Sequence, residues 1–432
     1  MGERGVLRRL VAARGRRPAT AALAAAVALC LAAAPAVELF GLGYRVQPFH
    51  FNDWAAYAGA VDRWYAGKTV YWTHPSGGYF ATYLYPPVYV LGFVPWFEAG
   101  LADPVAALVG GPPGSDVSAV LFEAGGFAAL WAGLLAAARA VGATVDRLDA
   151  VVLAAALACF YPLLFSVKLG QVSTFVAAGF AFAFVAGERA GETGSRGWRY
   201  LSGGLTTLTA GIKPYYLTSG AHLLRDRVRL VGALAVGLAA AGLSLAVFGI
   251  DTHLRYLDVL LWGKGWTEPP LSLVHWHPGY FEPLAALGNV TPLLSAVARA
   301  GVVVGTVAVT LAARDARDPA TRWATFGLGV AVFPLVAPTA YTQDLVVLLV
   351  PAVLLAGVEY RRGGRPWLPL LAVGLVHVHA YVAFAVSAWH ADAPALATAA
   401  VGVLQPAMWG AFLLVGLAAA RTAEAAGRGP FA

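Results

Sequence analysis

Long apolar runs, separated by short polar or basic segments, dominate the sequence between Ala19 and Ala420. Most runs contain Gly, Ala, Val and Leu without alternating polar residues, and each approaches the roughly 20 residues that a bilayer-spanning helix needs. This pattern predicts helices and argues against an outer-membrane barrel. We expect an all-α polytopic membrane protein, a helical bundle of about 12 transmembrane helices in a single domain. The predicted spans cover residues 19–40, 83–101, 117–138, 150–166, 169–187, 200–224, 229–249, 290–312, 323–338, 344–358, 366–388 and 395–420.

Composition supports lipid as the solvent. The chain is 59% hydrophobic and only 12% charged, whereas soluble chains carry about 25% charged residues. The formal charge of +7 does not indicate a nucleic-acid partner, because the basic residues form short clusters between apolar runs, as membrane topology requires. Cys30 and Cys159 both fall inside apolar runs, where we interpret them as buried small hydrophobes.

Basic loops predict the orientation. The arginines between Arg8 and Arg17 predict a cytoplasmic N-terminus, followed by a first span that is retained. We therefore expect a multi-pass integral protein of the cytoplasmic membrane. The basic loops at 225–229, 314–322 and 361–365 fit cytoplasmic positions. Two long segments rich in aromatic residues, histidine and proline, residues 41–82 and 251–287, then form the first and second outer loops.

One loop does not fit this scheme. Residues 187–199 hold three arginines, yet a strict count of spans places them outside. The next run, 200–224, is interrupted by Lys213-Pro214 and is either one kinked span or two half-helices that return to the same side. The second alternative moves the loop inside, but it requires a compensating change upstream.

An amphipathic helix is predicted in the first outer loop. Trp54, Tyr57, Val61 and Trp64 recur at helical spacing, which is typical of a helix lying in the membrane interface and ending near Gly67. Asp53 stands at its start. One interpretation is helix capping by Asn52 or Asp53; the other is a carboxylate that meets a substrate just above the hydrocarbon. The two are compatible.

Five short segments follow one another along the chain, namely Ala66–Tyr71 after Asp53, Tyr83–Pro87, Leu169–Val172, Gly211–Pro214 and Ala337–Tyr341. The chain resembles the GT-C type membrane glycosyltransferases, and it is most similar to glycosyltransferase family 87, which includes polyprenyl-phosphate-mannose-dependent mannosyltransferases of actinobacteria. It departs from the family pattern at Ser173, where Asn is usual, at Tyr341, where Trp is usual, and at Gln343-Asp344, where some members carry a His pair.

The resemblance implies an inverting glycosyltransferase. It would move a sugar, mannose by analogy, from a polyprenyl-phosphate donor to a hydroxyl of a lipid or glycan acceptor at the outer face. Asp53 is then the expected general base, because partial desolvation raises the pKa of a carboxylate. Tyr85, Gln171 and Tyr341 lie in the matching segments and are expected to bind substrate.

Positive charge is expected at the leaving phosphate. Lys168 and Lys213 are the lysines within the apolar spans or at their edges, and intramembrane charge is usually functional. The alternative is that each lysine extends to the nearest interface.

Further candidates lie in later segments. His275 and His277 are expected to contact lipid phosphate or sugar rather than metal, although a plain polar loop remains an alternative. Gln343, with Asp344, could bind sugar hydroxyls or cap a helix. His377 and His379, inside a predicted span, are interpreted as a hydrogen-bonded contact between helices. No metal or other cofactor is expected, because the sequence has no Asp-x-Asp motif.

Two other classes of protein compete with a transferase. Many spans, a broken helix and an intramembrane lysine would suit a secondary transporter, but the two halves of the chain show no visible match. A non-catalytic lipid-binding membrane protein is the third alternative.

Overall fold

The computed structural model describes residues 18–36, 51–74, 78–79, 82–101, 115–262, 280–281, 291–337, 340–389 and 405–427, together with Gly5 and Ala12. Nearly all of the described residues are helical, which confirms the all-α expectation. The α-helices are α2 (Pro18–Ala36), α3 (Asn52–Tyr65), α4 (Val90–Leu101), α6 (Ser115–Ala140), α7 (Arg147–Cys159), α8 (Tyr161–Leu169), α9 (Ser173–Thr193), α10 (Arg196–Ala210), α11 (Arg227–Trp262), α13 (Pro292–Ala312), α14 (Pro319–Ala331), α15 (Phe333–Val336), α16 (Leu349–Arg361), α17 (Trp367–Trp389) and α19 (Pro406–Ala426).

Three 3₁₀ segments and two short strands complete the described structure. The 3₁₀ segments are η2 (Pro87–Tyr89), η3 (Pro214–Arg225) and η4 (Thr342–Leu348). The strands β1 (Tyr280–Phe281) and β2 (Ala340–Tyr341) pair antiparallel, with Tyr280 opposite Tyr341.

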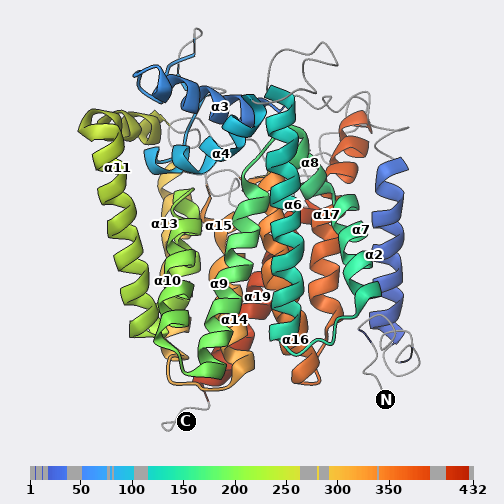
Figure 1. Cartoon of the computed structure of the whole chain (residues 1–432). Coiled ribbons are helices and arrows are strands. Elements are labelled where there is room, and N and C mark those ends of the chain that lie inside the picture. The colour runs from blue at the N-terminus through green and yellow to red at the C-terminus, as the bar shows by residue number, and fades with distance from the viewer. Residues whose placement is uncertain are drawn as a thin grey trace.

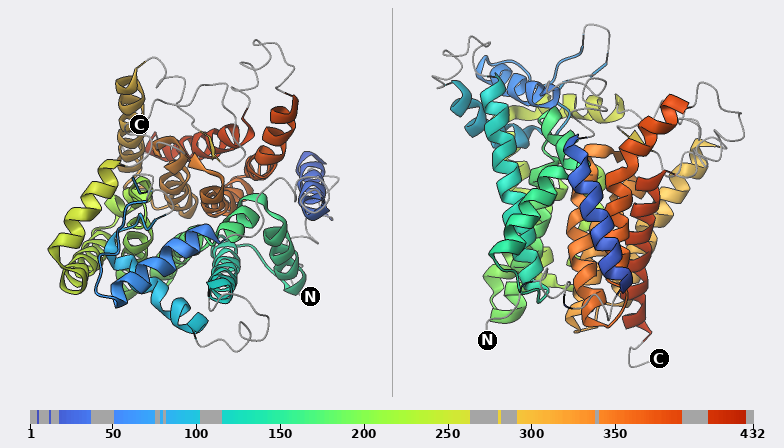
Figure 2. Two further views of the ribbon diagram at one scale, coloured as in Figure 1. Left: turned by 90° about the horizontal axis from the view of Figure 1, so that it is seen from above. Right: turned by 90° about the vertical axis from the view of Figure 1, so that its right-hand side faces the viewer.

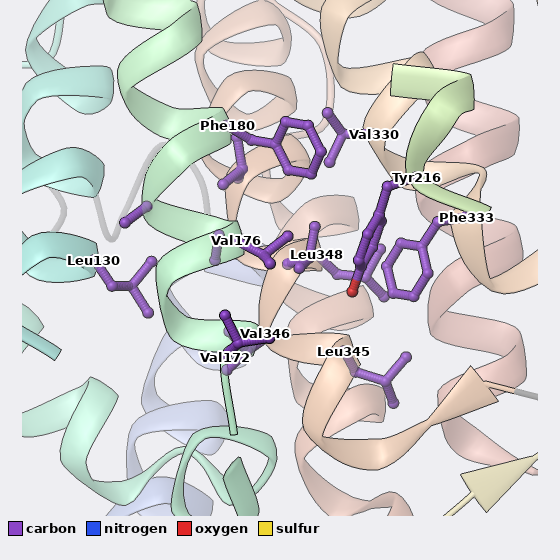
Figure 3. Packing of buried hydrophobic residues seen from close by; sticks show 14 of the residues in the cluster. Leu130, Val172, Val176, Phe180, Tyr216, Val330, Phe333, Leu345, Val346 and Leu348 are labelled. Atoms are coloured by element: carbon purple, nitrogen blue, oxygen red, sulfur yellow. The ribbon is translucent and has the colours of Figure 1, made fainter. Parts of the chain in front are cut away.

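The long helices stand side by side as a bundle, while α3 and α4 lie across one of its ends (Figure 1). The view along the bundle shows α3 crossing that end and α2 standing at the margin (Figure 2). The core lies between α6, α9, α14 and the 3₁₀ segments η3 and η4. There Val176 and Phe180 of α9 face Leu345 and Leu348 of η4 and Tyr216 of η3 (Figure 3).

The basic loops gather at the end of the bundle opposite α3. We call this the arginine-rich end, made by residues 187–199, 225–229, 314–322 and 361–365. The loops are joined there by hydrogen bonds and ion pairs, namely Arg322 to Glu188 (2.9 Å), Arg229 to the Gly187 carbonyl (2.8 Å), Arg225 to the Ala316 carbonyl (2.6 Å) and Arg362 to Asp318 (3.1 Å).

This arrangement decides between the two alternatives for residues 200–224. Helix α10 leads away from the arginine-rich end and η3 returns to it, so that Arg199 and Asp226 form an ion pair at 3.8 Å. The stretch is therefore two half-helices that return to the same side. The helix is broken between α10 and η3, because Lys213 is extended (φ −134°, ψ 129°) and Pro214 follows it.

The compensating change lies upstream, in the predicted span 83–101, which is wrong. That segment forms η2 and the 12-residue helix α4, which contains Pro95 and lies beside α3 (Figure 1). A helix of this length covers about 18 Å, less than the hydrocarbon thickness of a bilayer. Helices α3 and α4 therefore both lie at the end of the bundle where α6 begins (Figure 1).

The expected number of about 12 spans is not confirmed. Within the described ranges, five helices are long and apolar enough to cross a membrane, or six if α7 and α8, bent by 63°, form one broken span. These findings support a membrane protein. Cys30 is exposed on α2, so its interpretation as a buried residue is wrong.

Helix α11 bends at Gly249, where φ is 70° and ψ is 167°. The predicted span ended at this residue, and the helix instead continues to Trp262, lying across the α3 end (Figure 1). Aromatic contacts join α11 to α3 and to the segment that follows α3. Phe248 packs on Trp64 with ring centroids 5.5 Å apart, and Tyr256 stacks on Tyr71 at 5.9 Å.

Helices α10 and α11 approach closely through glycine. A Cβ at Gly203 would lie 2.0 Å from the Arg229 carbonyl oxygen and 2.9 Å from the Ala233 nitrogen. These are backbone atoms, which cannot move without shifting a helix. Small residues at such crossings let helix backbones pack closely in membranes.

We therefore expect Gly203→Ala to destabilise the protein by about 1–3 kcal/mol, because the methyl group overpacks the α10–α11 crossing. Gly242→Ala on α11 is the matched control, since a Cβ there meets nothing within 4 Å and alanine favours the helix. Unfolding midpoints in detergent micelles measure both variants. Equal midpoints for the two would contradict this account of the crossing.

Candidate active site

Helix α3 forms where the sequence predicts it, from Asn52 to Tyr65, and the chain turns at Gly67 (φ 66°). Trp54, Tyr57 and Val61 are buried, while Asp62 on the other face is exposed. Trp54 donates a hydrogen bond to Ser118 of α6 (2.9 Å). The apolar stripe thus seats α3 on the bundle.

Asp53 does not cap this helix. The residue at the N-cap is Phe51, which has a left-handed conformation (φ 42°, ψ 37°) and forms no side-chain cap. The Asp53 carboxylate instead accepts a hydrogen bond from Nε2 of Gln171 (2.8 Å) and remains partly exposed. The carboxylate is therefore held toward the bundle, in a residue that is half-buried as a whole.

Gln171 connects α3 to the bundle. Its Oε1 accepts hydrogen bonds from the hydroxyls of Tyr57 (2.5 Å) and Tyr85 (2.8 Å) and from the backbone N–H of Val172 (3.0 Å). With Nε2 bound to Asp53, this amide has one consistent orientation. Each polar atom of the buried amide is thus satisfied.

A glycine places Gln171 at this point. Gly170 ends α8 in the left-handed conformation (φ 70°, ψ 46°), and a Cβ there would lie 2.6 Å from the Cβ of Trp54. The turn and the close approach of α3 both require a residue without a side chain.

A buried ion pair lies beside this cluster. Lys213 Nζ donates to both oxygens of Asp344 (2.7 and 2.9 Å), and the hydroxyls of Tyr215 (2.6 Å) and Ser173 (2.7 Å) donate to the same carboxylate. Asp344 is 1% exposed. Lys213 Nζ also lies 5.8 Å from the ring centre of Tyr85. Tyr85 therefore joins the ion pair to the Gln171 cluster.

The surroundings raise the pKa of Asp53 to about 6. Burial has the largest effect, Asp344 adds to it, and the Lys213 ammonium and the Gln171 hydrogen bond oppose it. A carboxylate with this pKa is mostly ionised at pH 7 and binds a proton more readily than a free one. These are the properties of a general base.

The remaining predicted site residues are placed as follows. Lys168 lies in the last turn of α8, and its carbonyl oxygen accepts a hydrogen bond from the Phe51 N–H (3.1 Å) beside the start of α3. Tyr341 lies in β2 and Gln343 in η4, one residue before Asp344. His275 and His277 lie outside the described residues.

Among the intramembrane histidines, His377 does contact another helix. Its Nδ1 accepts a hydrogen bond from the Tyr161 N–H (3.1 Å) at the start of α8. The bond joins α17 to α8 rather than one of these histidines to the other.

Several residues of the site were not predicted from the sequence. The sequence pattern indicates Tyr57 only as part of the apolar stripe of α3, and it gives no signal for Tyr215. Glu123 on α6 is 3% exposed and lies near Gln171 and Asp53. Its one sequence signal is a lone acidic residue inside the apolar run 117–138.

The site offers no evident place for a metal. Across the described part of the chain, no group of three or more His, Cys, Asp or Glu side chains could hold an ion. The residues gathered here instead supply one partly exposed carboxylate, one buried ammonium and several hydroxyls.

Comparison with known proteins assigns the class. A family model, glycosyltransferase family 87, matches residues 83–338. Because the match covers more than half of the chain, the protein belongs to this family and is a membrane glycosyltransferase. The matched region includes Tyr85, Gln171 and Lys213, whereas Asp53 and Asp344 lie outside it. Neither the curated proteins nor the solved structures contain a match.

We expect the Lys213–Asp344 pair to be energetically coupled. Lys213→Met leaves a buried carboxylate without its cation and should cost about 3–5 kcal/mol of unfolding free energy. Adding Asp344→Asn removes that unpaired charge, so the double variant should be more stable than the sum of the single effects by at least about 1 kcal/mol.

Denaturation in mixed detergent micelles measures this double-mutant cycle. The control is Arg189→Gln, which breaks an exposed pair with Glu192 (62% and 58% exposed) and should change stability by less than about 0.5 kcal/mol. Additive effects at residues 213 and 344 would contradict the coupling.

Proposed function

We propose that this protein is an inverting glycosyltransferase that transfers a sugar, mannose, from a polyprenyl-phosphate donor to an acceptor hydroxyl at the outer face of the membrane. One observation carries the proposal: a partly exposed carboxylate, Asp53, is held by Gln171 next to a buried ammonium, Lys213, at one end of the bundle. A transferase of this kind needs both a base and a cation.

The proposed reaction uses Asp53 as the base. The carboxylate takes the proton of the acceptor hydroxyl as its oxygen attacks the anomeric carbon of the donor sugar. A new C–O bond forms on one face of the sugar while the bond to the phosphate breaks on the other. Polyprenyl phosphate leaves with the bonding electrons, the anomeric configuration inverts, and Asp53 returns its proton to water.

Lys213 is proposed to stabilise the leaving phosphate. Two N–H groups of its ammonium donate to Asp344, which leaves one for a ligand. Asp344 is fixed in turn by Ser173 and Tyr215, so the ammonium is held in place before substrate binds. Preorganised charge of this kind stabilises developing negative charge more effectively than a mobile side chain.

The membrane orientation supports a lipid-linked donor. The arginine-rich end should lie in the cytoplasm, because arginines concentrate in cytoplasmic loops. The Asp53 end then faces outward, at the level where the polar group of a polyprenyl phosphate meets water. The long apolar chain of such a donor can remain in the bilayer while its sugar reaches the carboxylate.

We expect Asp53→Asn to lower the transfer rate at least about a hundredfold, because an amide cannot accept the proton. Asn can still accept the Gln171 hydrogen bond through its oxygen, so the fold should be retained. The assay incubates purified protein with polyprenyl-phosphate-[¹⁴C]mannose and membrane lipids and measures transferred label.

Asp62→Asn is the matched control, an exposed aspartate on the same helix, and it should keep full activity. Folding of both variants is checked by their unfolding midpoints. Transfer by Asp53→Asn at the wild-type rate would refute the role of Asp53, and no transfer by wild type from any prenyl-phosphate sugar would refute the proposed donor.

The pH dependence should report the Asp53 carboxylate. Its pKa is raised from 3.8 to about 6, and only the ionised form accepts a proton. Therefore kcat/KM should be constant above about pH 7, half-maximal near pH 6, and fall about tenfold per pH unit below about pH 5. A profile that stays flat down to pH 4.5 would show that this carboxylate is not the base.

A further inference from the structure

A cavity of about 240 Å³ lies at the arginine-rich end of the bundle, opposite the candidate active site. Its walls come from α9, η3, the start of α11, the turn after α13, and α14. Five arginines line it, namely Arg225, Arg229, Arg314, Arg317 and Arg322. Only two carboxylates, those of Glu188 and Asp226, share the lining. The wall therefore carries an excess of positive charge.

The two carboxylates are already occupied within the protein. Glu188 accepts hydrogen bonds from Arg322 (2.9 Å) and from the Trp323 indole (2.9 Å). Asp226 caps the start of α11 by accepting the backbone N–H groups of Val228 (2.9 Å) and Arg229 (3.3 Å). Neither carboxylate is in a position to neutralise the whole cluster.

Arg225 is held by hydrogen bonds to neutral groups. Its guanidinium donates to the Thr325 hydroxyl (2.9 Å) and the Ala316 carbonyl (2.6 Å), both neutral groups, and these bonds fix it in the cavity wall. Arg317 is exposed, and no side-chain hydrogen bond or ion pair of it is present within the described ranges. Like charges gathered in this way repel one another unless an anion binds between them.

A buried histidine adds a second polar group to the wall. His222 is 5% exposed, and its Nδ1 donates to the Ser219 carbonyl (2.7 Å), because a carbonyl can only accept. Its Nε2 has no hydrogen-bond partner among the described residues, although such buried atoms are normally paired. A ligand that carries a hydroxyl or an acidic O–H would satisfy it.

We propose that this cavity binds a phosphate group, carried either by an anionic lipid headgroup or by a soluble phosphate. Guanidinium groups from four segments, η3, α11, the turn after α13 and α14, suit the tetrahedral oxygens of phosphate, to which arginine forms strong charge-assisted hydrogen bonds. The rings of Phe184 and Phe326 supply an apolar wall beside them. The site is separate from Asp53, and the proposal stands independently of the transferase reaction.

The test uses the full-length protein in phosphatidylcholine nanodiscs or detergent. In one arm, inorganic phosphate is titrated and the unfolding midpoint is compared with that in sodium chloride of equal ionic strength. In the other arm, native mass spectrometry compares the retention of added phosphatidylglycerol with that of phosphatidylcholine. Stabilisation by inorganic phosphate identifies a soluble source. Selective retention of phosphatidylglycerol, with no stabilisation by inorganic phosphate, identifies a lipid headgroup.

The variants make the result specific to the cavity. Arg225→Gln with Arg317→Gln should weaken binding of the responding ligand about tenfold or more, since each removes a charge-assisted hydrogen bond. Arg189→Gln with Arg196→Gln removes the same charge from exposed positions outside the cavity and should leave binding unchanged. If the double variant with Arg225→Gln and Arg317→Gln fails to fold, Arg317→Gln alone is used.

The proposal is overturned if neither phosphate source binds. It is equally overturned if the two charge-matched pairs of substitutions weaken binding to the same extent, since the effect would then follow net charge rather than the cavity.

Discussion

The side chain of Gln171 is the interaction on which the arrangement of the site depends. Its Oε1 accepts hydrogen bonds from the Tyr57 hydroxyl of α3, from the Tyr85 hydroxyl before η2 and from the backbone N–H of Val172. Its Nε2 donates to Asp53. These partners come from segments far apart in the sequence. A single neutral amide thus fixes the position of the charged group and the seating of α3 on the bundle, without adding a second charge that would alter the basicity of Asp53.

Buried charge is the second constraint. Lys213 and Asp344 are both nearly inaccessible, and the cost of removing them from water is offset by their mutual attraction and by hydrogen bonds from Ser173 and Tyr215. The pair is close enough to Asp53 to influence its pKa in both directions, with the ammonium favouring ionisation and the carboxylate opposing it. The balance leaves the pKa of Asp53 at about 6, which suits the base proposed for it.

Part of this site could be predicted from the sequence because short segments carry it. The stripe Trp54, Tyr57 and Val61 predicts α3, and the order of the matching segments brings Asp53, Tyr85, Gln171 and Lys213 together in one hypothesis. The structure places these residues side by side, and their roles in the reaction remain a prediction.

What could not be predicted depends on three-dimensional partners. Hydropathy alone cannot distinguish a full span from a shorter apolar helix such as α4, which packs beside α3. The acidic partner of Lys213 lies 131 residues further along the chain, so sequence spacing gives no hint of it. The arginine cavity likewise forms from five segments, α9, η3, the start of α11, the turn after α13 and α14, and only their meeting at one end creates it.

The two ends of the bundle are held together by different forces, and this has a consequence for how each responds to its surroundings. At the α3 end, α11 is attached through ring contacts on both sides of Gly249, Phe248 on Trp64 before it and Tyr256 on Tyr71 beyond it. At the other end arginines make the connections, through ion pairs and through hydrogen bonds to backbone carbonyls. Dissolved salt weakens the attraction between solvent-exposed charges, with a screening length of about 8 Å at physiological ionic strength, but it leaves ring packing largely unaffected. Rising ionic strength therefore loosens the connections at the arginine-rich end first, while the surface around the carboxylate keeps its shape.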